Sequence, residues 1–218
     1  MKHLYIATPV YDQQVSVGYC QSLCLTLMAC TKAGIVVSTD YKGGPYIHDN
    51  RNWLVHRFMK SGADTMLFID ADVSWDAQAV PKLYHSKHDV CGGVYPFKKD
   101  SEDYPIKLMD RIDREYRETM YLPGGFIQIR KTVFDAMTPK ADNFTCPSFG
   151  GETVYEYFQN VVYPGSGKVG EDVEFCNVWR RMGGTIWCLP DIDFEHQGPK
   201  QWKGNFAAFL GDKQAEAA

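Results

Sequence analysis

The chain has 218 residues, of which 44 % are apolar and 23 % are charged. It can therefore bury a core within one domain, and extended disorder is excluded. Its 23 basic and 27 acidic residues give a formal net charge of −4, which disfavours binding to nucleic acid or to an anionic membrane through bulk charge. The apolar stretches are too short to span a bilayer and the first residues lack the pattern of a signal peptide, so we expect a cytoplasmic location.

The first hundred residues alternate between short apolar runs and helical patterns. Strands are predicted at 4–7, 35–37, 65–69 and 90–95, and helices at 19–32 and 50–60. Thr8 and Pro9 are expected to end the first strand in a loop. This alternation predicts an α/β fold with a mainly parallel central sheet flanked by helices. In such sheets ligands collect beyond the carboxyl ends of the strands.

The second half of the chain is less regular. Residues 98–121 are polar and weakly periodic, which predicts a smaller antiparallel flap or hairpin. Further strands are predicted at 126–129 and 185–189, and helices at 132–137 and 171–182. We expect residues 1–210 to form a single domain. Residues 211–218 suggest a frayed tail, at a point where a longer protein with further domains was cut.

A run of four apolar residues leads directly into Asp70 and Asp72. On an extended backbone both carboxylates would point into one crevice while Ala71 points away. Two carboxylates at a strand end suit a hard divalent ion that keeps positions open for phosphate oxygens. Loop capping is the ordinary alternative, and the short pattern also arises by chance, since Asp191 and Asp193 match it in an expected turn.

Other polar residues allow two interpretations each. Glu171 and Asp172 could serve chemistry, or could complement the dipole of the helix that they begin. His196 follows a late strand and could return over the crevice, although a lone histidine is more often structural. Arg51 could pair with a phosphate or form an exposed salt bridge, and Lys200 could contact phosphate or be solvated. Thr8, Pro9, Tyr11 and Asp40 could hold a base, although turn chemistry explains them equally well.

Together, these ordered pieces resemble the GT-A type of nucleotide-sugar-dependent glycosyltransferases, especially the compact forms encoded by phages and large viruses. No single piece is specific, but the set spans nearly the whole chain. The matching pieces are Ile6–Asp12, Asn50–Val55, Leu67–Val73, Val90–Pro96, Gly124–Phe126, Gly170–Phe175 and Glu195–His196.

The resemblance implies roles for these residues. Asp72 would bind Mn²⁺ or Mg²⁺, with His196 as the later protein ligand; Asp70 is the third residue implied at the metal and would also contact the ribose, directly or through water. Glu171 and Asp172 match the acidic pair near the acceptor, with Asp172 as general base or acceptor ligand. The residues implied in binding the nucleotide sugar, most often a UDP-sugar, are Thr8, Pro9, Tyr11, Asp40, Arg51, Asp70, Ala71, Asp72, Gly124, Gly125 and Lys200. Gln-Gly-Pro follows His196 where a long basic loop is usual, which leaves Lys200 in doubt as a lid residue.

The expected activity is therefore metal-dependent transfer of a sugar from a nucleotide-diphosphate donor to a glycan hydroxyl, in the host cytoplasm if the chain is virus-encoded. One alternative is a phosphohydrolase of the haloacid-dehalogenase kind, whose Asp-x-Asp motif normally follows the first strand and continues to a Thr or Val where this chain has Ser74. The other is a non-catalytic module that binds a nucleotide or a glycan.

Overall fold

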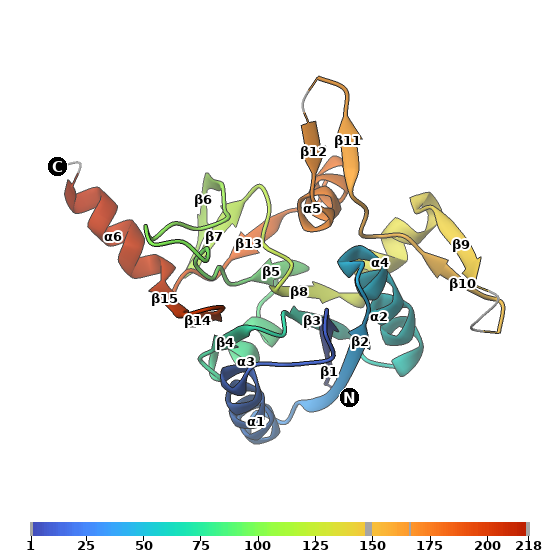
Figure 1. Ribbon diagram of the computed structural model, residues 1–218, viewed down its shortest axis with the longest axis horizontal. Coiled ribbons are helices and arrows are strands. Elements are labelled where there is room, and N and C mark those ends of the chain that lie inside the picture. The colour runs from blue at the N-terminus through green and yellow to red at the C-terminus, as the bar shows by residue number, and fades with distance from the viewer. Residues whose placement is uncertain (1, 147–149, 166, 217–218) are drawn as a thin grey trace.

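The computed structural model describes residues 2–146, 150–165 and 167–216. Its centre is an eight-stranded sheet in the order β2-β1-β3-β8-β5-β13-β7-β6 (Figure 1). These strands are β1 His3–Val10, β2 Val36–Gly43, β3 Thr65–Ile69, β5 Val90–Gly92, β6 Leu108–Asp113, β7 Tyr116–Thr119, β8 Phe126–Arg130 and β13 Ile186–Cys188. The helices are α1 Val17–Lys32, α2 Ile47–Ser61, α3 Ala79–Tyr84, α4 Lys131–Met137, α5 Glu171–Arg181 and α6 Phe206–Glu216, with a 3₁₀ turn at Thr138–Lys140.

Three small antiparallel sheets accompany the central one. They are formed by β9 Asn143–Cys146 with β10 Glu152–Tyr155, by β11 Val161–Tyr163 with β12 Gly167–Val169, and by β4 Val73–Trp75 with β14 Asp193–Gln197 and β15 Gln201–Asn205. The first two hairpins and α6 extend away from the body of the molecule (Figure 1).

The direction of the central strands confirms the predicted α/β class. β1 pairs in parallel with β2 and β3, and β5 pairs in parallel with β13. β8 lies between β3 and β5 and is antiparallel to both, so the five parallel strands all point the same way. Because β8 runs in the opposite direction, its first residues lie at the edge where β1 and β3 end.

The alternation of side chains along β1 assigns each neighbouring helix to a face of the sheet. Tyr5 and Ala7 belong to the apolar cluster that contains Leu54 and Phe58 of α2. Leu4 and Ile6 belong to the cluster that contains Tyr19 of α1. The two helices therefore cover opposite faces, as expected for strand–helix–strand units with right-handed crossovers.

Several predicted boundaries are wrong. β1 continues through Pro9 to Val10, and β2 continues to Gly43, so Asp40 lies inside a strand and not at its end. Beyond Ala7 β1 pairs with β2 alone, and proline is tolerated where a strand has a free side. In place of residues 90–95, the fourth predicted strand covers only Val90–Gly92.

The two regions expected to lie outside the core connect to it. The hairpin β6–β7, within residues 98–121, continues the central sheet because β7 pairs with β13. α6 begins at Phe206, before the segment expected to fray, and continues it as a helix to Glu216; Phe206 is buried against Tyr104 at 4.8 Å between ring centroids, whereas residues 211–215 are exposed. No helix within the described residues is long and apolar enough to cross a membrane.

Candidate active site

The Asp70–Asp72 segment forms a turn between β3 and β4, so the expectation of an extended backbone is wrong. The amide of Val73 donates to the carbonyl of Asp70 at 3.2 Å, which closes the turn. The turn is held from two other parts of the chain: the amide of Ser16 donates to the Ala71 carbonyl, and that of Gln197 donates to the Asp72 carbonyl, each at 2.8 Å. The two carboxylates consequently meet different partners.

Asp70 belongs to a buried charged network centred on Arg51. Arg51 Nη2 donates to Asp70 Oδ1 at 2.9 Å, and Nε donates to Glu171 Oε1 at 3.3 Å. The hydroxyl of Tyr95 donates to the other oxygen of Asp70 at 3.1 Å. Burial lowers the pKa of Arg51, but the nearby carboxylates, Asp70 and Glu171 foremost, raise it more, so the guanidinium stays charged.

This network corrects the role expected for Arg51. Its side chain is only 2 % exposed, and Nη1 also donates to the Gly124 carbonyl at 2.9 Å. A guanidinium buried among these acceptors is not placed to frame a nucleoside. Arg51 instead fixes Asp70 and Glu171 relative to one another.

Gly124 and Gly125 provide the space that this network requires. A Cβ atom at Gly125 would lie 2.3 Å from both Asp70 Oδ2 and the Tyr95 hydroxyl, and one at Gly124 would lie 2.8 Å from the Arg51 guanidinium. Any side chain here would displace the charged groups. The glycines thus allow the side chains of this network to lie close to the backbone. Their expected role was to let the donor sugar and the acceptor approach the backbone.

Asp172 lies at the start of α5, next to Glu171. Its Oδ2 accepts from the amide of Gly124 at 3.0 Å, and its Oδ1 accepts from the amide of Val173 at 2.7 Å. Burial and then the charge of Glu171 raise the pKa of Asp172 above its usual value. A carboxylate with a raised pKa is better suited to accept a proton than a fully solvated one.

Asp72 faces His196 and Lys98. His196 Nε2 lies 3.7 Å from Asp72 Oδ2, and Lys98 Nζ donates to the same oxygen at 2.5 Å. Burial raises the pKa of Asp72, but the neighbouring His196 and Lys98 lower it more, to about 2. The carboxylate is therefore ionised at neutral pH.

The donor set around Asp72 fits a divalent ion held by two protein ligands. His196 Nδ1 lies 2.9 Å from the carbonyl of Pro96, which can only accept, so Nδ1 carries a proton, and the tautomer that would bind a metal has its lone pair at Nε2, toward Asp72. Two atoms 3.7 Å apart can both contact an ion with bonds of about 2.1 Å. No group of three metal-ligating His, Cys, Asp or Glu side chains occurs among the described residues. Asp70 is held by Arg51 and Tyr95 and stands outside this pair.

A cavity of about 430 Å³ opens beside the turn at the carboxyl ends of β1 and β3. Pro9, Tyr11, Asp70, Ala71 and Asp72 line it, so Ala71 contributes to the cavity together with the two aspartates. Its other lining residues are Val10, Asp12, Gln14, Val15, Ser16, Gly44, Ile47 and Asn50. The volume lies within the range typical of small-molecule sites.

Besides Arg51, Gly124 and Gly125, three more residues implied in nucleotide binding lie outside the lining of this cavity. Thr8 is buried and bonded to the hydroxyl of Tyr19. Asp40 accepts hydrogen bonds from Tyr5 and Arg57. Lys200 pairs with Asp100 on the surface. Thr8 and Asp40 are thus not available to hold a base as expected, because the polar group of each already has a hydrogen-bond partner within the fold.

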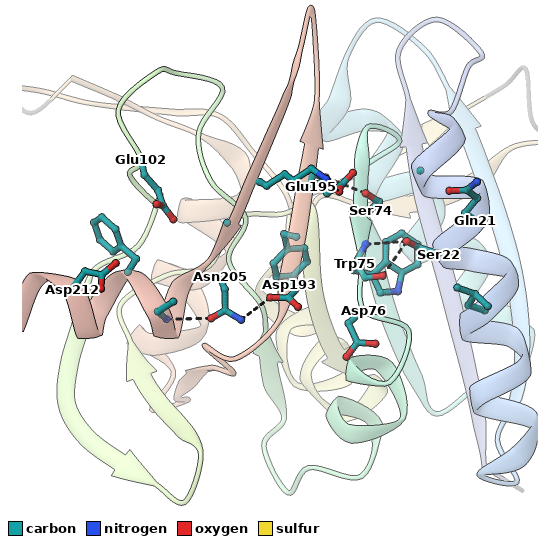
Figure 2. Close-up of a pocket in the computed structure, with 17 residues that line it drawn as sticks. Gln21, Ser22, Ser74, Trp75, Asp76, Glu102, Asp193, Glu195, Asn205 and Asp212 are labelled. Atoms are coloured by element: carbon teal, nitrogen blue, oxygen red, sulfur yellow. Dashed lines mark hydrogen bonds and ion pairs between the residues drawn. The ribbon is translucent and has the colours of Figure 1, made fainter.

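A larger cavity of about 850 Å³ lies elsewhere, between α1, β14, β15 and α6 (Figure 2). Figure 2 shows Asp193 bonded to Asn205 and Glu195 near Ser74. None of the residues implied in donor or metal binding lines this cavity. The smaller cavity is thus the candidate site despite its size.

Two contributors to the site were not singled out from the sequence. Tyr95 connects the Arg51–Asp70 network with the Asp72–His196 pair. Its hydroxyl donates to Asp70, and its ring packs edge-on against His196 with 4.8 Å between the ring centroids. Asn50 lines the cavity and donates to the Gly44 carbonyl at 2.8 Å. The available signal was position: Tyr95 closely follows a strand that ends at the same edge as β3.

Comparison with known proteins supports the fold. No family model and no curated protein matches the sequence. Among solved structures, A197 from STIV is similar over 95 % of this chain and 91 % of its own, with a TM-score of 0.56 and 18 % identity. At this identity the likeness concerns the fold alone. Fold and site together define an α/β protein with a ligand-sized cavity and an acidic centre where its parallel strands end.

Two further structures are more distant. One is a glycosyltransferase involved in the glycosylation of the major capsid of PBCV-1, with a TM-score of 0.38, 9 % identity and coverage of 62 % of this chain and 64 % of that one. The other, from Bacillus anthracis, is described as a glucose-1-phosphate thymidylyltransferase, with a TM-score of 0.44, 14 % identity and coverage of 99 % and 94 %. Likenesses at this level carry no argument about the reaction.

Proposed function

We propose that this protein is a metal-dependent glycosyltransferase that moves a sugar from a nucleotide-diphosphate donor, a UDP-sugar by preference, to a glycan hydroxyl. The observation that carries the proposal is the Asp72–His196 pair beside the cavity that Asp70, Ala71 and Asp72 line. This arrangement offers a place for a nucleoside and, next to it, two ligands for an ion that a diphosphate would share.

Asp72 and His196 would hold Mn²⁺ or Mg²⁺, and phosphate oxygens and water would complete its coordination. When bound, the ion stabilises the negative charge of the departing diphosphate. Asp70, oriented by Arg51 and Tyr95, would contact the ribose. Pro9 and Tyr11, which also line the cavity, would contact the base.

Asp172 would act on the acceptor. Its raised pKa suits it to take the proton of the attacking hydroxyl, and two backbone amides hold its carboxylate in place. Glu171 supports this role by keeping a second negative charge nearby.

The phosphohydrolase alternative receives less support. The carboxylate of Asp70, which would be its nucleophile, is paired with the buried guanidinium of Arg51, which makes it a weaker nucleophile. The later acidic pair that such an enzyme would use for its metal, Asp191 and Asp193, is bonded to Asn205, and Asp193 lines the other cavity.

The first test is a thermal-shift panel of UDP, GDP, CDP and ADP, with and without Mn²⁺, on the wild type, Asp72→Ala and Asp193→Ala. A ligand at a hundred times its Kd stabilises a protein by about 2.7 kcal/mol, which corresponds to several degrees. We expect one nucleotide to raise Tm only with Mn²⁺, in the wild type and in the control Asp193→Ala but not in Asp72→Ala.

Absence of any shift in the wild type with Mn²⁺ present would contradict the donor site. Turnover decides between an enzyme and a binding module. Asp172→Asn should retain the nucleotide-dependent shift and lose transfer to acceptor, whereas a module would bind nucleotide without consuming any donor in either form.

A further inference from the structure

Lys98 forms an ion pair with the oxygen atom of Asp72 that would coordinate a metal ion. Its Nζ lies 2.5 Å from Asp72 Oδ2, the same oxygen that faces His196 Nε2. We infer that Lys98 and a divalent cation are alternative partners of Asp72, and that the displaced Lys98 ammonium moves to the diphosphate of the ligand. Cation and anion would then bind cooperatively through this one side chain. The inference rests on the proposed function and adds to it a coupling between the binding of the cation and that of the anion.

Electrostatics makes the two partners exclusive. With Lys98 in place the carboxylate of Asp72 is neutralised, so the pair attracts a cation weakly. An ion between Asp72 and His196 would also lie beside the ammonium and repel it. Binding of the ion alone therefore costs the Lys98–Asp72 contact and gains a like-charge neighbour.

The surroundings of Lys98 allow it to move. Its side chain is one-third exposed, and with Phe97, Lys99 and His196 it lines an open hollow of about 560 Å³. A Cβ atom at Gly198 would lie 3.3 Å from Lys98 Cδ, so the missing side chain leaves room for the aliphatic stem. Within the described residues, Asp72 is the hydrogen-bond partner of the Lys98 ammonium.

A diphosphate bound to the cation reduces the cost of displacing Lys98 from Asp72. A diphosphate that ligates the cation places negative charge within reach of the displaced ammonium, which then gains a partner in place of the one it lost. Each ligand would raise the affinity for the other by the same factor, because coupling between two binding sites is reciprocal.

The test measures binding of Mn²⁺ by calorimetry, alone and with inorganic pyrophosphate as the anionic probe, on the wild type, Lys98→Met and Lys99→Met. Lys99 is the matched control, because its ammonium also lies 2.5 Å from a carboxylate, that of Asp103. Lys98→Met should bind Mn²⁺ alone roughly fivefold more tightly than the wild type, the scale of a partly exposed ion pair. It should also show less enhancement of Mn²⁺ affinity by pyrophosphate, whereas Lys99→Met should match the wild type in both.

Equal Mn²⁺ affinities in Lys98→Met and the wild type would overturn the inference, as would an undiminished effect of pyrophosphate. Asp72→Ala separates this failure from that of the proposed function. If Asp72→Ala loses Mn²⁺ binding while Lys98→Met behaves as the wild type, the metal site stands and the role of Lys98 falls. If Asp72→Ala binds Mn²⁺ as the wild type does, the ion lies elsewhere and both fall.

Discussion

At the scale of single residues, the buried guanidinium of Arg51 organises more of the site than any motif in the sequence suggests. It contacts Asp70 and Glu171 and the carbonyl of Gly124, and Asp172 lies within its electrostatic reach. A buried cation among three carboxylates compensates charges that would otherwise repel one another. Replacement of Arg51 by an apolar residue would therefore leave three neighbouring carboxylates without a compensating positive charge.

Arg51→Met should destabilise the fold by about 3–5 kcal/mol at pH 7, the scale for breaking a buried ion pair. Without the cation, the pKa of Asp172, already raised by burial and by Glu171, should rise further. A raised pKa stabilises the folded state at low pH, so the deficit should shrink as the pH falls from 7 toward 4. Urea unfolding at several pH values measures both effects.

Arg57→Met is the control, because Arg57 pairs with Asp40 near the surface and is 41 % exposed. Its loss should cost no more than about 1 kcal/mol. Equal costs for the two variants would show that the Arg51 network adds nothing to stability.

Some residues of the site can be predicted from the local sequence, whereas their pairing with partners that are distant in the sequence cannot. Asp70, Asp72 and His196 could be selected from local context, because an apolar strand precedes the first two and the third follows a late strand. The pairing of Asp70 with Arg51 and of Asp72 with Lys98 could not be predicted, because the two carboxylates are nearly equally close in sequence to each cation. Only the turn at Ala71, held by Ser16 and Gln197, separates them.

At the scale of elements, the buried His88 connects the last three strands of the central sheet, β13, β7 and β6. His88 stacks on Trp187 of β13 at 4.4 Å between ring centroids and packs against Tyr116 of β7. Asp113 of β6 lies 3.4 Å from its Nε2. One imidazole thus contacts three consecutive strands of the sheet.

Burial lowers the pKa of His88 below 6.5, and this outweighs the opposing charge of Asp113. A group whose pKa is lowered by folding stabilises the protein above its unfolded pKa and loses that contribution as the pH falls. The free energy of unfolding should therefore decrease between about pH 6.5 and 5. His88→Gln should flatten this part of the profile, measured by urea unfolding; a profile identical to that of the wild type would rule out His88 as its source.

The predicted elements that proved correct have long patterns or clear end signals. α2 ends at Gly62, which has a positive φ of 78°, and β3 has the predicted bounds. The sheet of β4, β14 and β15 was missed because β4 is three residues long, too short for a pattern, and its partner lies more than a hundred residues away. Pairing at that distance leaves no local trace in the sequence.

At the scale of the whole molecule, the candidate site joins segments that are far apart in the sequence. His196 of β14 lies opposite Val73 of β4, and the amides of Ser16 and Gln197 both donate to carbonyls of the Asp70–Asp72 turn. A ligand held by Asp72 and His196 should therefore stiffen segments that are remote in sequence.

Hydrogen exchange can show this coupling. Mn²⁺ together with the nucleotide that raises Tm should slow exchange at the amides of Ser16, Val73 and Gln197, because opening any of these bonds would disturb the ligated turn. The amides of the β6–β7 hairpin, which lies beyond β13 in the sheet, should be unaffected. Uniform slowing across the molecule would instead indicate global stabilisation without a specific link.

The order of strands also constrains how the chain can assemble during synthesis. β13 lies between β5 and β7, although both of these strands precede it by more than sixty residues. A nascent chain that has not yet released β13 from the ribosome can form the β6–β7 hairpin but cannot attach it to the sheet. The same late segment carries β14 and hence His196. A chain that has not yet added β14 would thus possess the wall of the candidate cavity without its imidazole, and we expect metal-dependent binding to begin only after residue 196 has been added.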